Sequence, residues 1–264
     1  MIITLSGMST SGKTYLAKAL SDMPQFSKAV SVTTRPMRDG EADGVDYHFV
    51  STDEFKALID KGEFLEYEAS HKAMYGTAAF EVERILARGS SAVLVLEPEG
   101  VVSMERIAKE RGLPFVSVYI ETSMPVIMER FVTERMFKEM ETRGIIDFQA
   151  HADRLDVILS KESLWPGRKN WDLVLKDLHL PGRFDQVLKQ LVELTQTRDM
   201  SIFGEVVQPA PVKIHSYTDP KALVTQLPGL YRQLKHKLIT SEDMWKTLSG
   251  EKKLVHAPSL EMGS

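Results

Sequence analysis

The segment GMSTSGKT, residues 7–14, constrains this chain more than any other feature. It fits the pattern G-x4-G-K-[ST], follows the apolar run MIITLS and precedes KTYLAKALSD, whose apolar residues have helical spacing. A glycine-rich turn between a strand and a helix points backbone N–H groups inward, where they can bind phosphate oxygens. The alternative is a flexible serine- and glycine-rich turn, which would not require the complete pattern in this context. The segment therefore predicts a nucleotide-phosphate site.

Two residues of this loop have a predicted chemical role. Lys13 is expected to bind the β- and γ-phosphates of a nucleoside triphosphate, and the Thr14 hydroxyl is expected to bind Mg²⁺. The residues predicted to bind ATP are Gly7, Ser9, Thr10, Ser11, Gly12, Lys13 and Thr14. The pattern indicates a nucleotide but does not identify the reaction.

The rest of the chain alternates predicted strands with predicted helices. SAVLVLEP and FVSVYIE are near-continuous apolar runs, typical of strands that are buried on both faces of a parallel sheet. STDEFKALIDKG has the helix signals of a capping box, Ser51 with Glu54, and a stop at Gly62. A long charged helix is predicted from Ser123 to about Arg143. The alternation predicts an α/β fold on a parallel sheet.

Composition excludes several classes of protein. The formal net charge is −4, so no global basic field favours nucleic acid. Cysteine is absent, which excludes disulfides and thiolate metal sites and fits a reducing cytosol. No apolar run is long enough to span a bilayer, and the N-terminus lacks the basic region of a secretory signal. We expect a soluble cytoplasmic protein that binds neither membrane nor nucleic acid.

The character of the chain changes after about Met200. VVQPAPVKIHSYTDP is rich in proline and has no period, which predicts a linker over 201–220. Two short helices are predicted within 221–264, the second capped at Thr240 or Ser241, and the end HAPSLEMGS is expected to be disordered. The Leu, Tyr and Trp spacing favours packing against the main domain or a partner subunit over a binding site, and homo-oligomerisation stays open.

A second polar region, SVTTRPMRDGEADGVDYHF at residues 31–49, places Arg35 and Arg38 on either side of Pro36 and adds Tyr47. Paired guanidinium groups match the geometry of a phosphate, and a tyrosine hydroxyl adds a donor. Taken singly, these arginines would be assigned to surface salt bridges on a solvated loop. Further polar side chains follow in GEFLEYEA and MYGT: Glu66, Tyr75 and Thr77.

Together the loop and the segments SVTTRPMRDGEADGVDYHFVS, KGEFLEYEA and MYGTAAFEVE resemble the guanylate kinase family, over residues 1 to about 196. The resemblance implies a P-loop NTPase fold: a parallel five-stranded sheet flanked by helices, an inserted small mixed α/β domain that binds the nucleoside monophosphate, and a helical lid. The implied boundaries are a core of 1–30, 90–130 and 156–200, an insert of 31–89 and a lid of about 131–155.

The same resemblance implies roles for the acceptor site. The residues that match those gripping the acceptor monophosphate are Arg35, Arg38, Tyr47 and Tyr75. Glu66 matches the carboxylate that accepts from guanine N1–H and the 2-amino group, and Ser31 and Thr77 match the hydroxyls that face guanine O6. Because adenine lacks that pair of donors, a buried carboxylate would select guanine.

The chain departs from the family pattern after its middle strand. The family has an Asp-x-Asp pair there, whereas AVLVLEPEG has Val95 at the first acidic position and Glu97 at the second. Glu97 is expected to contact the guanine amino group or a magnesium-bound water. The alternative is a surface acid at the end of a strand.

The predicted lid also differs from the family. The Arg-Gly pair at Arg143 and the later Arg154 keep the interval between two family arginines, after a helix longer than usual. Matching from the other side would instead make Arg135 the lid arginine, and Arg130 is expected on a solvated helix face. The predicted catalytic residues are Lys13, Arg143 and Arg154, with Arg135 as the alternative.

The expected activity is ATP-dependent phosphorylation of GMP or dGMP to the diphosphate, with Mg²⁺. Lid closure would exclude water, and no general base is required because the acceptor phosphate is already an oxyanion. Two alternatives stay open. One is a kinase for another or a modified nucleoside monophosphate or a related small phosphate acceptor, as in phage-type nucleotide kinases. The other is a non-catalytic guanylate kinase-like binding module, against which the intact Gly12-Lys13-Thr14 argues.

Overall fold

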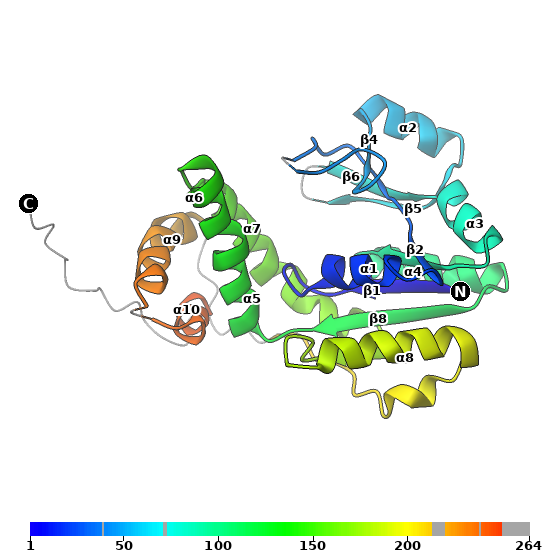
Figure 1. Cartoon of the computed structure of the whole chain (residues 1–264). Helices are drawn as coiled ribbons and strands as arrows, with labels where there is room; N and C mark the ends of the chain where they lie inside the picture. The colour runs from blue at the N-terminus through cyan, green and yellow to red at the C-terminus, as the bar shows by residue number, and fades with distance from the viewer. Residues whose placement is uncertain (39, 71–72, 213–219, 238, 250–264) are drawn as a thin grey trace, which may run out of the picture. The chain divides into compact units, whose positions relative to one another are not determined.

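The structure is a computed structural model that describes residues 1–38, 40–70, 73–212, 220–237 and 239–249 (Figure 1). The chain divides into two compact units. Unit 1 consists of Met1–Gly7, Gly12–Ile120 and Arg168–Gln208. Unit 2 consists of Met8–Ser11, Glu121–Gly167 and Pro209–Ser264.

A five-stranded parallel sheet forms the centre of unit 1, in the order β2-β7-β1-β8-β9. Its strands are β1 (Ile2–Ser6), β2 (Phe26–Lys28), β7 (Ser91–Val95), β8 (Phe115–Glu121) and β9 (Leu173–Lys176). Apolar side chains of these strands share one core with α1 (Lys13–Ser21) and α8 (Arg183–Thr197), and α4 (Pro98–Glu110) contacts β1. The predicted α/β fold on a parallel five-stranded sheet flanked by helices is confirmed, because the apolar runs are strands covered by helices.

A second, mixed sheet lies in the segment 31–89 of unit 1, in the order β4-β3-β6-β5 (Figure 1). Its strands are β3 (Val32–Thr33), β4 (His48–Phe49), β5 (Phe64–Ser70) and β6 (Ala73–Ala78), and its helices are α2 (Thr52–Asp60) and α3 (Ala79–Ala87). Strand β3 is parallel to β4 and antiparallel to β6, and β6 is antiparallel to β5. EFLEYEAS alternates weakly, which predicts an extended edge segment, and it forms β5 at the edge of this sheet. Strand β6 was not predicted, because AMYGTA contains a glycine and no polar–apolar alternation.

Two local predictions in this region have different outcomes. The capping box is confirmed: the Ser51 hydroxyl accepts from the Glu54 N–H, and the Glu54 carboxylate accepts from the Ser51 N–H. The apolar spacing of SKAVSVTT predicts one strand, and this prediction is wrong, because the segment forms β2 and β3 in two different sheets. An apolar run has the same pattern in either sheet, so it does not reveal where the hydrogen-bonding partner changes.

The described part of unit 2 is helical. Its elements are α5 (Met124–Arg130), the π-helical η1 (Phe131–Phe137), α6 (Lys138–Arg143), α7 (Phe148–Ser160), the 3₁₀-helical η2 (Glu162–Arg168), α9 (Pro220–Lys235) and α10 (Ser241–Leu248). The long helix predicted from Ser123 is confirmed as the continuous run α5–η1–α6, which ends at Gly144 with φ 68. The π-helical turn within it was not predicted. In the described ranges no helix is both long and apolar enough to cross a membrane.

The C-terminal helices pack within unit 2. Helix α9 contacts α7, and α10 contacts α5 (Figure 1). Leu227 of α9 and Trp245 of α10 belong to the same hydrophobic core as Phe131 and Leu155. The expectation that these helices pack against the main domain is confirmed for the described residues. Thr240 is the N-cap of α10, as one of the two predicted positions.

The boundaries of the domains remain predictions. The compact units group residues 121–130 and 156–167, which were assigned to the core, with the predicted lid in unit 2. The predicted linker 201–220 begins in a 3₁₀ turn, η3 (Met200–Phe203), and its residues 213–219 lie outside the described residues. The end HAPSLEMGS, predicted to be disordered, also lies outside them.

Candidate functional site

The glycine-rich loop joins β1 to α1. Gly12 is the N-cap of α1 and has φ 101, a backbone conformation that residues other than glycine rarely adopt. The Lys13 ammonium donates to the carbonyl oxygen of Gly7 at 2.6 Å. Thr14 lies exposed in the first turn of α1. The first N–H groups of an α-helix have no acceptor within the helix, and together with the Lys13 charge they make this loop suited to an anion.

Residues 8–11 of the same loop belong to unit 2, where a buried carboxylate holds Ser9. Glu162 of η2 is 0% exposed. Its carboxylate accepts from the Ser9 backbone N–H at 2.6 Å and from the Ser9 hydroxyl at 3.0 Å. Arg154 of α7 donates from Nη2 to Glu162 at 2.8 Å and also to the Ser9 hydroxyl oxygen. The predicted catalytic arginine and a loop residue therefore share one buried acid.

Helix α5 holds the next loop residue. Arg130 Nη1 donates to the carbonyl oxygen of Thr10 at 3.0 Å. The Thr10 hydroxyl has two acceptors in reach, the carbonyl oxygens of Ser9 at 2.7 Å and of Ile127 at 3.2 Å. The expectation that Arg130 lies on a solvated helix face is wrong, because it is half-buried and bound to the loop. Neither Arg130 nor Glu162 could be assigned by a motif, since each meets the loop only through the folding of unit 2.

The other two lid candidates have different partners. Arg143 ends α6, is exposed, and pairs with Glu139 at 3.5 Å. Arg135 lies in η1, with its guanidinium carbon 6.0 Å from the centre of the Phe131 ring. The structure thus brings Arg154 to the loop, and the roles of Arg143 and Arg135 remain predictions.

The predicted phosphate-gripping residues gather in the mixed-sheet region of unit 1. The guanidinium of Arg35 lies 5.4 Å from the centre of the Tyr47 ring, and the rings of Tyr47 and Tyr75 meet edge-on at 6.0 Å. Glu41 accepts from Arg35 Nη2 at 2.8 Å and from the Arg38 backbone N–H at 2.8 Å. The Arg38 side chain is exposed. Glu41 was not predicted, although its place three residues after Arg38 within one polar loop made it a candidate partner.

The ionisation of this group follows from its contacts. Burial lowers the pKa of Arg35, but the hydrogen bond and charge of Glu41 outweigh it and raise that pKa. Burial raises the pKa of Tyr47, with the charge of Tyr75 adding to the effect. Arg35 is therefore a permanent cation beside a tyrosine that keeps its proton, which is a pairing suited to a phosphate.

Glu66 and Thr77 face each other across β5 and β6. Glu66 is 7% exposed, and its Oε1 accepts from the Thr77 hydroxyl at 2.5 Å. Burial raises the pKa of Glu66, and the hydrogen bonds from Thr77 oppose that rise. A Cβ on Gly100 would lie 3.0 Å from Glu66 Oε2, so the first turn of α4 approaches the carboxylate closely. Ser31 is half-buried, and its carbonyl oxygen accepts from the His48 N–H.

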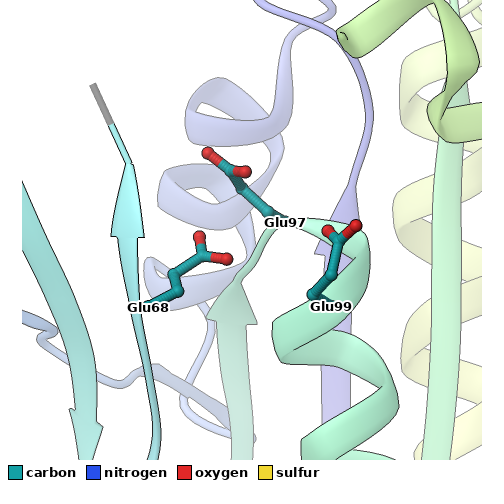
Figure 2. A group of neighbouring side chains, drawn as sticks. All are labelled: Glu68, Glu97 and Glu99. Atoms are coloured by element: carbon teal, nitrogen blue, oxygen red, sulfur yellow. The ribbon is translucent and has the colours of Figure 1, made fainter.

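Glu97, the N-cap of α4, is part of a cluster of three acids. Its carboxylate lies with those of Glu68 on β5 and Glu99 on α4, and one oxygen of each lies within 4.8 Å of the others (Figure 2). Carboxylate oxygens are ligands that Mg²⁺ accepts. Glu68 and Glu99 were not predicted; strand alternation could have identified Glu68, because it shares a face with Glu66. Val95 packs against the core of the parallel sheet.

The part of the chain that contains these residues is similar to known proteins. Residues 1–164 match the family model described as guanylate kinase. A guanylate kinase from Sphingopyxis alaskensis is 30% identical over 207 residues, which cover 77% of this chain and 88% of the relative. One from Chlorobium luteolum is 31% identical over 169 residues, 62% of this chain and 84% of the relative. The crystal structure of guanylate kinase from Anaplasma phagocytophilum matches with a TM-score of 0.53 and 24% sequence identity, over 76% of this chain and 86% of the crystallised chain. This likeness supports the fold alone.

Proposed function

The chain belongs to the guanylate kinase family, and from that premise we propose how its own residues carry ATP-dependent phosphorylation of GMP to GDP. As a member of this family it is a nucleoside monophosphate kinase. The observation that carries the assignment of the site is the buried Glu66, which lies on the mixed sheet next to the Thr77 hydroxyl. Deoxy-GMP as a second acceptor, the Mg²⁺ requirement and a cytoplasmic location are parts of the same proposal.

Glu66 would recognise the guanine base. The carboxylate accepts from guanine N1–H and the 2-amino group, and burial strengthens these bonds while making an acceptor without such donors costly to bind. Thr77 has a single hydroxyl proton, which it donates to Glu66. We therefore assign Thr77 to orienting the carboxylate, and we assign the donor for guanine O6 to Ser31.

The acceptor phosphate would be bound by the residues predicted for it: Arg35, Arg38, Tyr47 and Tyr75. Charge-assisted hydrogen bonds from guanidinium groups are the strongest that these side chains can offer. Glu41 already occupies Nη2 of Arg35, so a bound phosphate shares the guanidinium with Glu41 or displaces it. This internal pairing keeps Arg35 in place when no acceptor is bound.

The triphosphate of ATP would be bound by the loop 7–14, through its backbone N–H groups and Lys13. The hydroxyl of Thr14, with Glu97 through a water, supplies the hard oxygen ligands that fit Mg²⁺. When bound, Mg²⁺ neutralises the charge on the β- and γ-phosphate oxygens. Lys13 adds a fixed positive charge at the same phosphates.

The transferring phosphoryl group would be stabilised by Arg154, with Arg143 as the second lid arginine and Arg135 as its alternative. The acceptor phosphate is itself an oxyanion, so the reaction needs in-line positioning and charge neutralisation rather than a general base. The contact of Arg154 with the loop residue Ser9 supports this role.

Release of ADP, measured with GMP, dGMP, AMP, UMP and dTMP as acceptors, tests the choice of substrate. We expect GMP or dGMP to exceed the other acceptors in kcat/KM by about 100-fold or more, because the unpaired buried carboxylate penalises them. Activity on a non-guanine acceptor alone would reject the proposal and favour the alternative nucleotide kinase. No activity with any acceptor would favour the binding module.

Glu66→Gln tests the residue assignment. Loss of a charge-assisted hydrogen bond is expected to lower kcat/KM for GMP by about 10- to 100-fold and to leave the KM for ATP unchanged. Glu63→Gln is the matched control, because Glu63 is exposed just before β5. Equal GMP kinetics in the Glu66→Gln and Glu63→Gln variants would remove Glu66 from the site.

A further inference from the structure

Glu162 is a buried acid that accepts hydrogen bonds from Ser9 and Arg154. It is 0% exposed, and taking a carboxylate out of water is unfavourable unless hydrogen bonds compensate for the lost hydration. Its oxygens accept from the Ser9 N–H at 2.6 Å, the Ser9 hydroxyl at 3.0 Å and Arg154 Nη2 at 2.8 Å. One partner, Ser9, belongs to the loop, and the other, Arg154, belongs to the predicted lid. The burial of this carboxylate is therefore compensated only when both residues are in position.

The contact with Ser9 determines how the loop backbone is turned. The Ser9 N–H donates to Glu162 at 2.6 Å, so this amide is used within the protein. The next residue, Thr10, has φ 60, which is unfavourable for a residue other than glycine. Arg130 and Ile127 hold Thr10 in that conformation through its carbonyl and its hydroxyl. Two neighbouring loop residues are thus held from three elements of unit 2.

The contact with Arg154 determines how its guanidinium is turned. Nη2 is used on Glu162 and Ser9, and Nε is buried with no hydrogen-bond partner among the residues that the structure describes. Because the guanidinium is planar, holding one end fixes the direction of its remaining N–H groups. A carboxylate at 2.8 Å also holds the cation in place without a nucleotide.

We propose that Glu162 is a positioning residue for phosphoryl transfer: its carboxylate holds Ser9 in the phosphate loop and Arg154 on α7 in one arrangement, and it does not touch the nucleotide. The effect on the transferring phosphoryl group rests on the proposed role of Arg154. The effect on the loop rests on the Ser9 contacts alone, so it concerns ADP binding whatever the acceptor is. Preorganised donors act without a reorganisation cost during the reaction, which is why fixing them matters for rate.

Glu162→Gln keeps the shape of the side chain and removes its charge, so it tests the proposal directly. We expect an affinity for ADP about 5- to 10-fold weaker by calorimetry, a kcat about 10- to 100-fold lower and an unchanged KM for GMP. Glu81→Gln is the matched control, because Glu81 is a 5% exposed acid of unit 1 that is paired with Arg84. A control variant with the same losses, or a Glu162→Gln variant with normal ADP affinity and kcat, would overturn the proposal.

A double-mutant cycle separates positioning from simple stabilisation. If Glu162 acts through Arg154, the Glu162→Gln/Arg154→Gln enzyme has about the same kcat as Arg154→Gln alone, because the second change has nothing left to misplace. If the loss of kcat in the double variant equals the product of the losses in the two single variants, the proposal is overturned.

Glu162→Asp keeps the charge and shortens its reach, and it serves if Glu162→Gln does not fold. We expect an intermediate kcat and ADP affinity at a melting temperature close to that of the unchanged enzyme. Normal kcat and affinity in this variant would overturn the proposal. If the unchanged enzyme binds ADP but does not phosphorylate GMP, the proposed substrate fails, and the ADP affinities still decide whether Glu162 positions the loop.

Discussion

The acceptor segment 31–89 and the helical unit 2 hold their charged residues in different ways. In the acceptor segment Arg35 meets Glu41 six residues away, and Glu66 meets Thr77 eleven residues away. In unit 2, Arg154 lies 145 residues from its partner Ser9, and Glu162 lies 153 residues from it. Short separations close small loops at little entropic cost, whereas the long ones form only with the core that surrounds them. Local motifs therefore describe the first site well and the second poorly.

Lys13→Ala should give the largest effect, because Lys13 is the side chain proposed to bind the β- and γ-phosphates of ATP. We expect kcat to fall about 10³-fold, since a fixed charge at the transferring phosphates is lost. Steady-state kinetics at saturating GMP checks this. Lys18→Ala is the control, because Lys18 is exposed on the same helix. Near-normal turnover by Lys13→Ala would contradict the mechanism.

Leu227→Ala tests whether unit 2 depends on its C-terminal helices. Leu227 is 0% exposed in the core that includes Leu155 of α7, so we expect the free energy of unfolding to fall by about 2–5 kcal/mol in urea. The control Leu180→Ala, at a 49% exposed position, should change it by less than about 0.5 kcal/mol. A Leu227→Ala change as small as that of the control would show that α9 contributes little to unit 2.

The smallest expected effect is the change of the free energy of unfolding with pH. It compares two carboxyl groups of the acceptor segment, Glu66 and Glu41. Burial raises the pKa of Glu66 above its ordinary 4.5, so its contribution to stability is fully present below 4.5 and is lost as pH rises through the raised pKa. Urea unfolding across this interval should show the unchanged protein losing stability relative to Glu66→Gln. Parallel curves for the two proteins would contradict the assignment.

Glu41 provides the opposite sign. Burial acts to raise its pKa, but the hydrogen bonds and charges of Arg35 and Arg38 lower it below 4.5. Its contribution is therefore present above 4.5 and is lost as pH falls through the lowered pKa. Glu41→Gln should make the protein less sensitive to acid at those values. The difference in free energy of unfolding between variant and unchanged protein should change with pH in opposite directions for Glu41→Gln and Glu66→Gln. A change in the same direction would show that the two carboxyl groups do not differ as described.

Much of the fold could be predicted because its signals are local. The strand and helix on either side of the glycine-rich loop, the apolar runs of β7 and β8 and the capping box of α2 each follow from one short segment, and the structure confirms them. Strand β6 and the π-helical turn were missed. Their formation depends on pairing with β5 and on packing in the core of unit 2, and no local pattern reports either.

The sequence by itself determined the parallel sheet, the glycine-rich loop between a strand and a helix, and the family, because strand alternation, glycine positions and motif order follow from backbone chemistry over a few residues. The tertiary structure decided that Arg130 binds the loop, that Glu162 links Ser9 to Arg154, and that the C-terminal helices complete the core of unit 2. The physical reason is that a buried charge is stable only beside its partners, and those partners become neighbours only when distant segments pack together.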